Sequence, residues 1–232
     1  MNIHWRTEFA PTVDSSVLNE DLEVTMFKLG VLVSGGGTNL QAIIDRIEDG
    51  TLKNIEIVAI VSNVEDAYAL ERAKKHNINN IFIDRKAFGS TKDYEEELIK
   101  YFNSKQVDLI VLAGFMRILT NKFIKAFENK IINIHPALIP AFSGKGYYGL
   151  KVHEAALERG VKLAGATVHF VIEGADEGPI IIQKAIDVEE TDTAETLQKR
   201  VMEQIEWKIY PEAIKLIAED KIKIVNNIVK IK

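Results

Sequence analysis

The sequence alternates short apolar runs with stretches of helical periodicity, and this order is what most constrains the fold. The apolar runs cover residues 28–34, 55–63, 80–84, 108–113 and 130–134. Between them, helical patterns cover residues 38–49, 66–76, 91–105 and 120–129. Strands that alternate with helices in this way form βαβ units, whose strands run parallel. The sequence therefore predicts an α/β, Rossmann-like fold with a mostly parallel central sheet and helices on both faces.

The pattern changes after residue 134. The remaining elements are expected at residues 152–159 (helix), 162–172 and 179–188 (strands) and 193–218 (helix). Only the turn EGADEG separates the two strands, which predicts an antiparallel extension of the sheet. The last helix is expected to be broken or kinked near Pro211. In the absence of a linker or a repeat, residues 26–232 are predicted to form one domain, and residues 1–25 a poorly ordered extension that adds no chemistry.

Composition excludes several classes of protein. The 232 residues include 29 Lys and Arg and 34 Asp and Glu, so the formal net charge is −5. Such a chain lacks the broad basic surface that nucleic acid requires, and no apolar run approaches the roughly 18 residues of a membrane span. Cysteine is absent, which excludes disulfides, thiolate metal ligands and thiol nucleophiles. Because no signal or transit peptide is recognisable, we expect a cytoplasmic protein.

The stretch VLVSGGGTNLQAI, residues 31–43, leads from a strand through three glycines into a helix. Leu40 stands where a dinucleotide fingerprint needs its third glycine, and Leu40-Gln41 stands where a P-loop needs Gly-Lys. Thr38 and Gln41 can form a capping box, which is a purely structural role. However, the first acid of the helix is Asp45, so its positive end is open to an anion. The loop suits a single phosphate group.

The stretch NIHPALIP begins at Asn133 and ends an apolar strand. Asn133 and His135 are two residues apart, so both side chains project to the same side at the edge where open α/β sheets bind ligands. An amide can donate to a developing oxyanion, and an imidazole can transfer a proton near neutral pH. Asp176 is a candidate to orient the ring, although a turn would also use Asp there. Spacing alone does not join Asp176 to His135.

Six stretches resemble the phosphoribosylglycinamide formyltransferase family in order and nearly in spacing. They are SGGGTNLQAIID, VSNVEDAYALERA, DLIVLAGFMRIL, INIHPALIP, ATVHFVIEGADEGPIIIQ and EWKIYPEAI. The similarity extends from about Lys28 to Ala218. Members of this family transfer the formyl group of 10-formyltetrahydrofolate to the amine of 5′-phosphoribosylglycinamide (glycinamide ribonucleotide) in de novo purine biosynthesis. The resemblance implies that activity, with folate as the formyl donor and no metal.

The resemblance also implies roles for individual residues. The catalytic group would be Asn133, His135 and Asp176. The phosphate of the ribonucleotide would be held by Gly37, Thr38 and Asn39, joined by Glu206. Folate would contact Met116, Arg117, Ile118, Leu119, Asn133, Ile172, Glu173, Gly174, Ala175, Asp176 and Lys92, with apolar walls at Leu112 and Ile131.

These roles predict a mechanism. The amine attacks the formyl carbon on N10 of the folate, and Asn133 and protonated His135 stabilise the tetrahedral oxyanion. His135 then helps to carry a proton to N10, while Asp176 favours the imidazolium and orients it. His169 is expected to be a packed, hydrogen-bonded residue near the site rather than a ligand.

Two features depart from the family pattern. After Pro140, the loop AFSGKGYYGLKVH is longer and richer in glycine than its family counterpart, so its contacts are not transferred. A family arginine that helps to bind folate falls near Thr91 and Lys92, and the folate role of Lys92 rests on that position alone.

Other functions remain open from the sequence. A formyltetrahydrofolate deformylase-like hydrolase would use the same three catalytic residues with water as acceptor, but it carries an additional N-terminal domain, for which about 27 residues leave no room. Methionyl-tRNA formyltransferase would need a further C-terminal domain and a basic surface. A non-enzymatic nucleotide-binding module would explain the glycine loop but not the catalytic group. The sequence also leaves a homodimer open.

Overall fold

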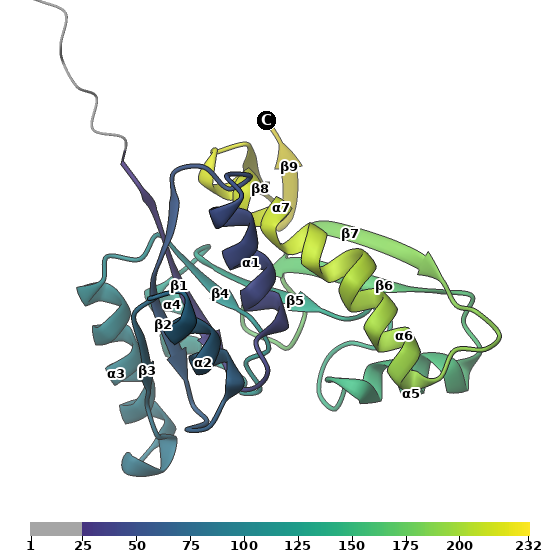
Figure 1. The fold of residues 1–232 in the computed structure, drawn as a ribbon, viewed down its shortest axis with the longest axis horizontal. Coiled ribbons are helices and arrows are strands. Elements are labelled where there is room, and N and C mark those ends of the chain that lie inside the picture. Colours follow the sequence, from purple (N-terminus) through teal and green to yellow (C-terminus); the bar gives the residue numbers. More distant parts are fainter. Residues whose placement is uncertain (1–24) are drawn as a thin grey trace, which may run out of the picture.

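The computed structural model describes residues 25–232. The prediction that residues 1–25 form a poorly ordered extension therefore falls outside the described residues, apart from residue 25 itself. The described chain forms a seven-stranded sheet in the order β3-β2-β1-β4-β5-β6-β7 and a separate hairpin, β8-β9 (Figure 1). None of the helices in residues 25–232 is long and apolar enough to cross a bilayer.

The main sheet is mostly parallel. Its strands are β1 (Phe27–Val33), β2 (Ile55–Ser62), β3 (Asn80–Phe82), β4 (Leu109–Leu112), β5 (Ile131–His135), β6 (Leu163–Phe170) and β7 (Ile180–Asp187). The first five strands pair in parallel, and β6 and β7 are added antiparallel. The predicted fold class, including the antiparallel extension, is therefore confirmed.

Helices cover both faces of this sheet. They are α1 (Thr38–Glu48), α2 (Tyr68–Lys75), α3 (Thr91–Ser104), α4 (Asn121–Ala126), α5 (Leu150–Arg159), α6 (Ala194–Val201) and α7 (Trp207–Ala218), with a 3₁₀ turn at Arg85–Ala87. One hydrophobic cluster joins α1, α2, α6 and α7 to one face, and a second joins α3 and α4 to the other. The C-terminal tail forms β8 (Ile222–Val225) and β9 (Ile228–Ile231).

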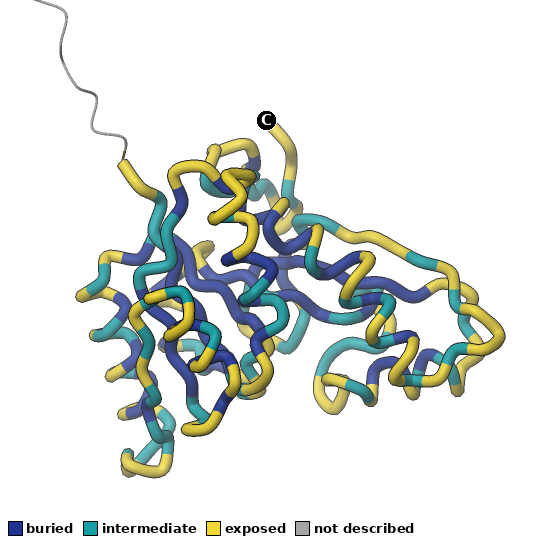
Figure 2. The backbone as a smooth tube through the Cα atoms, viewed as in Figure 1, coloured by how far each residue is buried: buried dark blue, intermediate teal, exposed yellow. Residues whose placement is uncertain are grey.

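Strand β1 shows how the sequence produces these two layers. Leu29 and Val31 belong to the cluster under α1, whereas Leu32 belongs to the cluster under α3, as the two-residue period of a strand requires. A Cβ at Gly30 would lie 2.7 Å from the ring of Phe102, so glycine at this position lets α3 pack close to the strand. The inner strands β1, β2, β4, β5 and β6 consequently form the buried centre of the molecule, whereas the edge strand β7 is mostly exposed (Figure 2).

The last helical region differs from the prediction. Helix α7 continues through Pro211, and the irregularity is instead a π-helical turn, Met202–Glu206, directly before α7. A π-turn accommodates one extra residue per turn and is common at functional sites. The predicted break near Pro211 is therefore wrong in position. Glu206 lies at the end of this π-turn, where its carboxyl group meets Asn39.

The order of the strands defines a topological switch point between β1 and β4, where α/β sheets bind ligands at the carboxyl edge. Ser34, directly after β1, joins the loops at this edge. Its hydroxyl donates to Asn63 Oδ1 at 2.6 Å and accepts from the amide of Met116 at 2.9 Å. The loops that follow β1, β2 and β4 are thus tied together.

We predict that Tyr210→Phe destabilises the fold. The buried hydroxyl of Tyr210 donates to the carbonyls of Leu112 and Ile132 at 2.9 and 3.2 Å, and its loss should cost about 1–2 kcal/mol. Urea unfolding should show a lower midpoint with an unchanged slope. Tyr147→Phe, at an exposed ring, is the control and should stay within about 0.5 kcal/mol of the parent. Equal stabilities for the two variants would contradict the role of the Tyr210 bond.

Candidate active site

Asn133 and His135 lie at the carboxyl end of β5, as expected, and pairing with β6 brings a third polar side chain beside them. In the antiparallel register, Asn133 is opposite His169 and His135 is opposite Thr167. The amide nitrogen of Asn133 lies 3.2 Å from His169 Nε2. The register between β5 and β6 therefore decides which side chains meet at the site.

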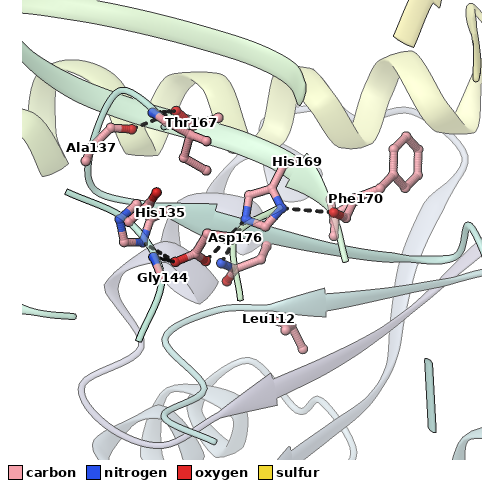
Figure 3. Close-up of polar contacts among 12 residues, drawn as sticks. Leu112, His135, Ala137, Gly144, Thr167, His169, Phe170 and Asp176 are labelled. Carbon is pink, nitrogen blue, oxygen red and sulfur yellow. Dashed lines mark hydrogen bonds and ion pairs between the residues drawn. The ribbon is translucent and has the colours of Figure 1, made fainter. Parts of the chain in front are cut away.

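Asp176, in the loop between β6 and β7, bridges the two imidazoles. Its Oδ2 lies 3.5 Å from His135 Nδ1, and its Oδ1 lies 3.6 Å from His169 Nε2 (Figure 3). The backbone of Asp176 has φ of 61°, a left-handed conformation that Asp tolerates better than most residues. The structure thus brings Asn133, His135 and Asp176 together, which sequence spacing could not do.

The surroundings of Asp176 keep it ionised. Burial opposes the charge, but the nearby imidazoles of His169 and His135 and the hydrogen bond from the Gly144 amide outweigh it, so the pKa of Asp176 is lowered from its usual value. The Gly144 amide donates to Oδ2 at 2.9 Å. The site therefore holds a fixed negative charge between two groups that can carry a proton.

His169 is a member of this cluster that the sequence analysis placed only near the site. It is 2% exposed, and its Nδ1 lies 2.9 Å from the carbonyl of Phe170. Because that carbonyl can only accept, Nδ1 carries a hydrogen and Nε2 faces Asn133 and Asp176. The sequence does show that Thr167 and His169 lie on the same face of their strand. Only the pairing of β5 with β6 shows that this face meets Asn133 and His135.

The glycine-rich loop after Pro140 contacts the catalytic group through its backbone. The carbonyl of Phe142 lies 2.8 Å from His135 Nε2, and the Gly144 amide reaches Asp176. Gly144, Gly146 and Gly149 all have positive φ, so the path of this loop requires glycine. A substrate that engages His135 Nε2 must displace the Phe142 carbonyl.

The capping box predicted for Thr38 and Gln41 is wrong. Gly37 is the N-cap of α1, with φ 68° and ψ 34°, and no side chain caps the helix. Thr38 is the first helical residue, and its hydroxyl lies 3.2 Å from Met202 Sδ, while Gln41 donates to Asp45. The first turn contains no acid, so the unpaired N–H groups at this helix end are available to an anion.

Helix α2 holds the glycine loop in place. The carbonyl of Gly35 accepts from the Ala69 amide at 3.0 Å, and the carbonyl of Gly36 accepts from Arg72 Nε at 2.8 Å. A Cβ at Gly37 would lie 2.7 Å from the Cβ of Ala69. The close approach and the positive φ explain why glycine is needed at Gly37.

Glu206, which is buried, pairs with the partly buried Asn39 beside this loop. Asn39 Nδ2 donates to Glu206 Oε2 at 2.7 Å, and Asn39 Oδ1 has no partner among residues 25–232. Burial raises the pKa of Glu206, and the bond from Asn39 opposes that rise. A carboxyl and an amide with unused capacity are suited to hydroxyl groups of a ligand.

The segment Met116–Leu119 and the loop Ile172–Asp176 lie at the same edge. Met116 and Ile118 are 56% and 71% exposed, while Leu112 and Ile131 are buried in the second hydrophobic cluster. The two segments are linked, because Asn121 Nδ2 donates to Glu173 Oε2 at 2.8 Å.

Lys92 is exposed in the first turn of α3. Within residues 25–232, no hydrogen bond or ion pair joins it to the other candidate residues.

Two further features bear on ligands. A cavity of about 280 Å³ lies on the outer side of α1 and is lined by Thr38, Gln41, Ala42, Asp45, Arg46, Arg72 and Trp207. It adjoins the glycine loop rather than the catalytic group.

In the described part of the chain, no three His, Asp or Glu side chains are arranged to hold a metal ion. An amide, two imidazoles and a carboxylate beside an anion-ready helix end are suited to acid–base group transfer.

The class of the protein follows from a comparison with protein families. Residues 27–214 match the family model described as Formyl transferase. Since the match covers most of the chain, the chain belongs to the formyl transferase family.

Individual relatives narrow the class. The chain is 41% identical over 203 residues to a phosphoribosylglycinamide formyltransferase of Haemophilus influenzae, covering 88% of this chain and 92% of that one. A crystal structure of glycinamide ribonucleotide transformylase 1 from Symbiobacterium toebii matches with a TM-score of 0.85 and 43% identity, covering 94% of this chain and 99% of that one. Within its family, the chain groups with the phosphoribosylglycinamide formyltransferases, and the resemblance drawn from the sequence is confirmed.

Some relatives are much longer. The chain is 40% identical over 203 residues to the trifunctional purine biosynthetic protein adenosine-3 of Gallus gallus, with 88% of this chain aligned, but it spans only 20% of that protein.

We predict that Gly37→Ala distorts the glycine loop. The added Cβ would meet Ala69 at a position with positive φ, so the variant should lose about 1–3 kcal/mol of stability. Gly36→Ala is the matched control, because a Cβ there has nothing within 4 Å. Thermal unfolding of the two variants measures the difference. Equal destabilisation by both substitutions would show that the contact with Ala69 is not the constraint on Gly37.

Proposed function

We propose that this chain transfers the formyl group of 10-formyltetrahydrofolate to the amine of 5′-phosphoribosylglycinamide in de novo purine biosynthesis. The observation that carries the proposal is the meeting of Asn133, His135 and Asp176 at the sheet edge that also carries the glycine loop. Membership of the formyl transferase family supports the chemistry. The relatives named phosphoribosylglycinamide formyltransferase support the acceptor.

The ribonucleotide phosphate is assigned to Gly37, Thr38 and Asn39. The absence of an acid in the first turn of α1 supports this assignment, because the helix dipole and the free amides then act on the ligand alone. An ionised Glu206 would repel a phosphate, and its pairing with Asn39 suits it to the ribose hydroxyls. This refines the role that the resemblance implied for Glu206.

The folate is assigned to the exposed segment Met116–Leu119 and the loop Ile172–Asp176. Exposed apolar side chains next to backbone N–H and C=O groups suit a flat heterocycle that carries several donors and acceptors. Asn133 is assigned to the folate as well, and its side-chain amide lies 3.2 Å from His169 Nε2. Lys92 is retained as a proposed folate contact because it lies near the position of the family arginine that helps to bind folate.

The transfer proceeds by attack of the glycinamide amine on the formyl carbon. A carbon–nitrogen bond forms, and the carbonyl oxygen becomes an oxyanion that the Asn133 amide and the His135 imidazolium stabilise. The bond from the formyl carbon to N10 then breaks, N10 takes a proton by way of His135, and the attacking amine loses one. Asp176 holds His135 in orientation throughout. The products are the formylated ribonucleotide and tetrahydrofolate.

The partners of the protein are therefore two small molecules. A homodimer and a cytoplasmic location stay predictions from the sequence. Gel filtration with light scattering would measure the oligomeric state.

The proposal is tested by following the loss of 10-formyltetrahydrofolate with and without glycinamide ribonucleotide. We expect loss only when the ribonucleotide is present, with an equal amount of formylated product. Loss that proceeds at the same rate without the ribonucleotide, and releases formate, would support a deformylase-like hydrolase instead.

We predict that Asp176→Asn lowers kcat by ~10²- to 10⁴-fold, the usual cost of losing acid–base assistance. The substitution keeps the size of the side chain and removes the charge between His135 and His169. The KM for the ribonucleotide should change far less, because that substrate is held mainly by the glycine loop. Steady-state kinetics measure both constants.

Glu177→Gln is the control for this change. Glu177 is the exposed neighbour of Asp176, and its neutralisation should leave kcat within about twofold of the parent. A folded Asp176→Asn variant with kcat in that same range would reduce Asp176 to an ordinary turn residue.

A further inference from the structure

Packing holds the segment Met116–Leu119 only at Leu119, which is buried in the second hydrophobic cluster. Two of its four side chains, Met116 and Ile118, are mostly exposed, and exposed apolar groups contribute little to fixing a backbone. The segment instead has a polar anchor at each end. Ser34 binds the Met116 amide at one end, and Glu95 binds Thr120 at the other.

Glu95 acts on the start of helix α4. The amide of Thr120 donates to Glu95 Oε1 at 2.9 Å, and the Thr120 hydroxyl donates to Oε2. Thr120 is the N-cap of α4, yet its side chain does not cap the helix. The carboxylate of Glu95 thus supplies from α3 an acceptor for the amide and the hydroxyl of the N-cap residue itself, and so fixes the residue at which α4 begins. A helix of only six residues depends on such outside support.

Because Glu95 is buried, its carboxyl group loses its hydration on folding, and this loss costs free energy. Glu95 is 2% exposed and lies on the face of α3 that also buries Tyr94, Leu98 and Phe102. A buried carboxylate is tolerated only where charge-assisted hydrogen bonds offset its desolvation. The hydrogen bonds recorded for this carboxylate within residues 25–232 both come from Thr120.

Tyr94, the residue before Glu95, contacts the same segment. The guanidinium of Arg117 lies over the Tyr94 ring, 5.9 Å from its centroid. Helix α3 thus holds the segment at two points, one through the Arg117 side chain and one through the backbone at Thr120.

The geometry points to Glu95 as a positioning residue for the formyl donor. It fixes the carboxyl end of the Met116–Leu119 segment, so that the backbone groups of this segment are set for the heterocycle of the folate before it binds. Glu95 does not touch the donor and acts through Thr120. This inference rests on the proposed function and on the assignment of folate to this segment.

The experiment compares Glu95→Ala with Glu96→Ala by steady-state kinetics. Glu96 is the matched control, because it is the next residue of α3 and also contacts α4, through a surface ion pair with Lys122. We expect Glu95→Ala to raise the KM for 10-formyltetrahydrofolate by about tenfold, since the two partly buried donors of Thr120 lose their acceptor. The KM for glycinamide ribonucleotide should stay within about twofold, and Glu96→Ala should leave both KM values unchanged.

Two conservative variants extend the test. Glu95→Gln keeps an acceptor for the Thr120 amide and should restore most of the affinity for the donor. Thr120→Ala keeps the amide bond, removes only the hydroxyl bond and should raise the KM for the donor by less than Glu95→Ala does. These variants decide the question if Glu95→Ala does not fold.

The outcomes separate the inference from the proposed function. A parent enzyme without ribonucleotide-dependent transfer would overturn the proposed function, whatever the variants do. A parent that transfers formyl normally, with Glu95→Ala raising both KM values equally or neither, would overturn the positioning role alone. A simple loss of stability would reduce the amount of active enzyme and leave both KM values where they were.

Discussion

The carboxylate of Asp176, shared between the imidazoles of His135 and His169, is the interaction on which the site depends. A buried charge of this kind needs partners on several sides, and each partner comes from a different element. His135 comes from β5, His169 from β6 and the Gly144 amide from the loop before α5. The antiparallel register of β5 and β6 is therefore a functional requirement, because a shift of one residue would turn Asn133 and His169 to opposite faces.

The two proposed substrate regions are built from opposite layers of the same sheet. The glycine loop is held by α2, and its pair Asn39 and Glu206 joins α1 to the π-turn before α7, all on one face. The Met116–Leu119 segment is held by α3 on the other face. Ser34, which directly precedes the three glycines at the switch point between β1 and β4, accepts from the Met116 amide at the start of the second region. Formyl transfer at the edge of the sheet thus joins ligands that the two layers position separately.

Sequence patterns predicted the layers and the candidate residues but not their contacts. The apolar periods gave the order of the elements, and the strand-end positions of Asn133 and His135 indicated chemistry. Resemblance alone joined Asp176 to them, since a left-handed residue in a loop leaves no periodic signal. The capping box failed because Gly37 could adopt a left-handed cap and released Thr38 to contact Met202. The irregularity predicted at Pro211 lies instead at the π-turn Met202–Glu206. Glu95 lies within an ordinary amphipathic helix pattern, so the sequence did not indicate that its side chain is buried.

A crystal structure with glycinamide ribonucleotide and a folate analogue that cannot transfer a formyl group would test the account most directly. The account predicts that the phosphate lies against the amides at Gly37 to Asn39 and that the amine faces Asn133 and His135. It also predicts that the Phe142 carbonyl no longer accepts from His135. A phosphate bound instead in the cavity beside Arg46 and Arg72, with the amine remote from His135, would contradict it.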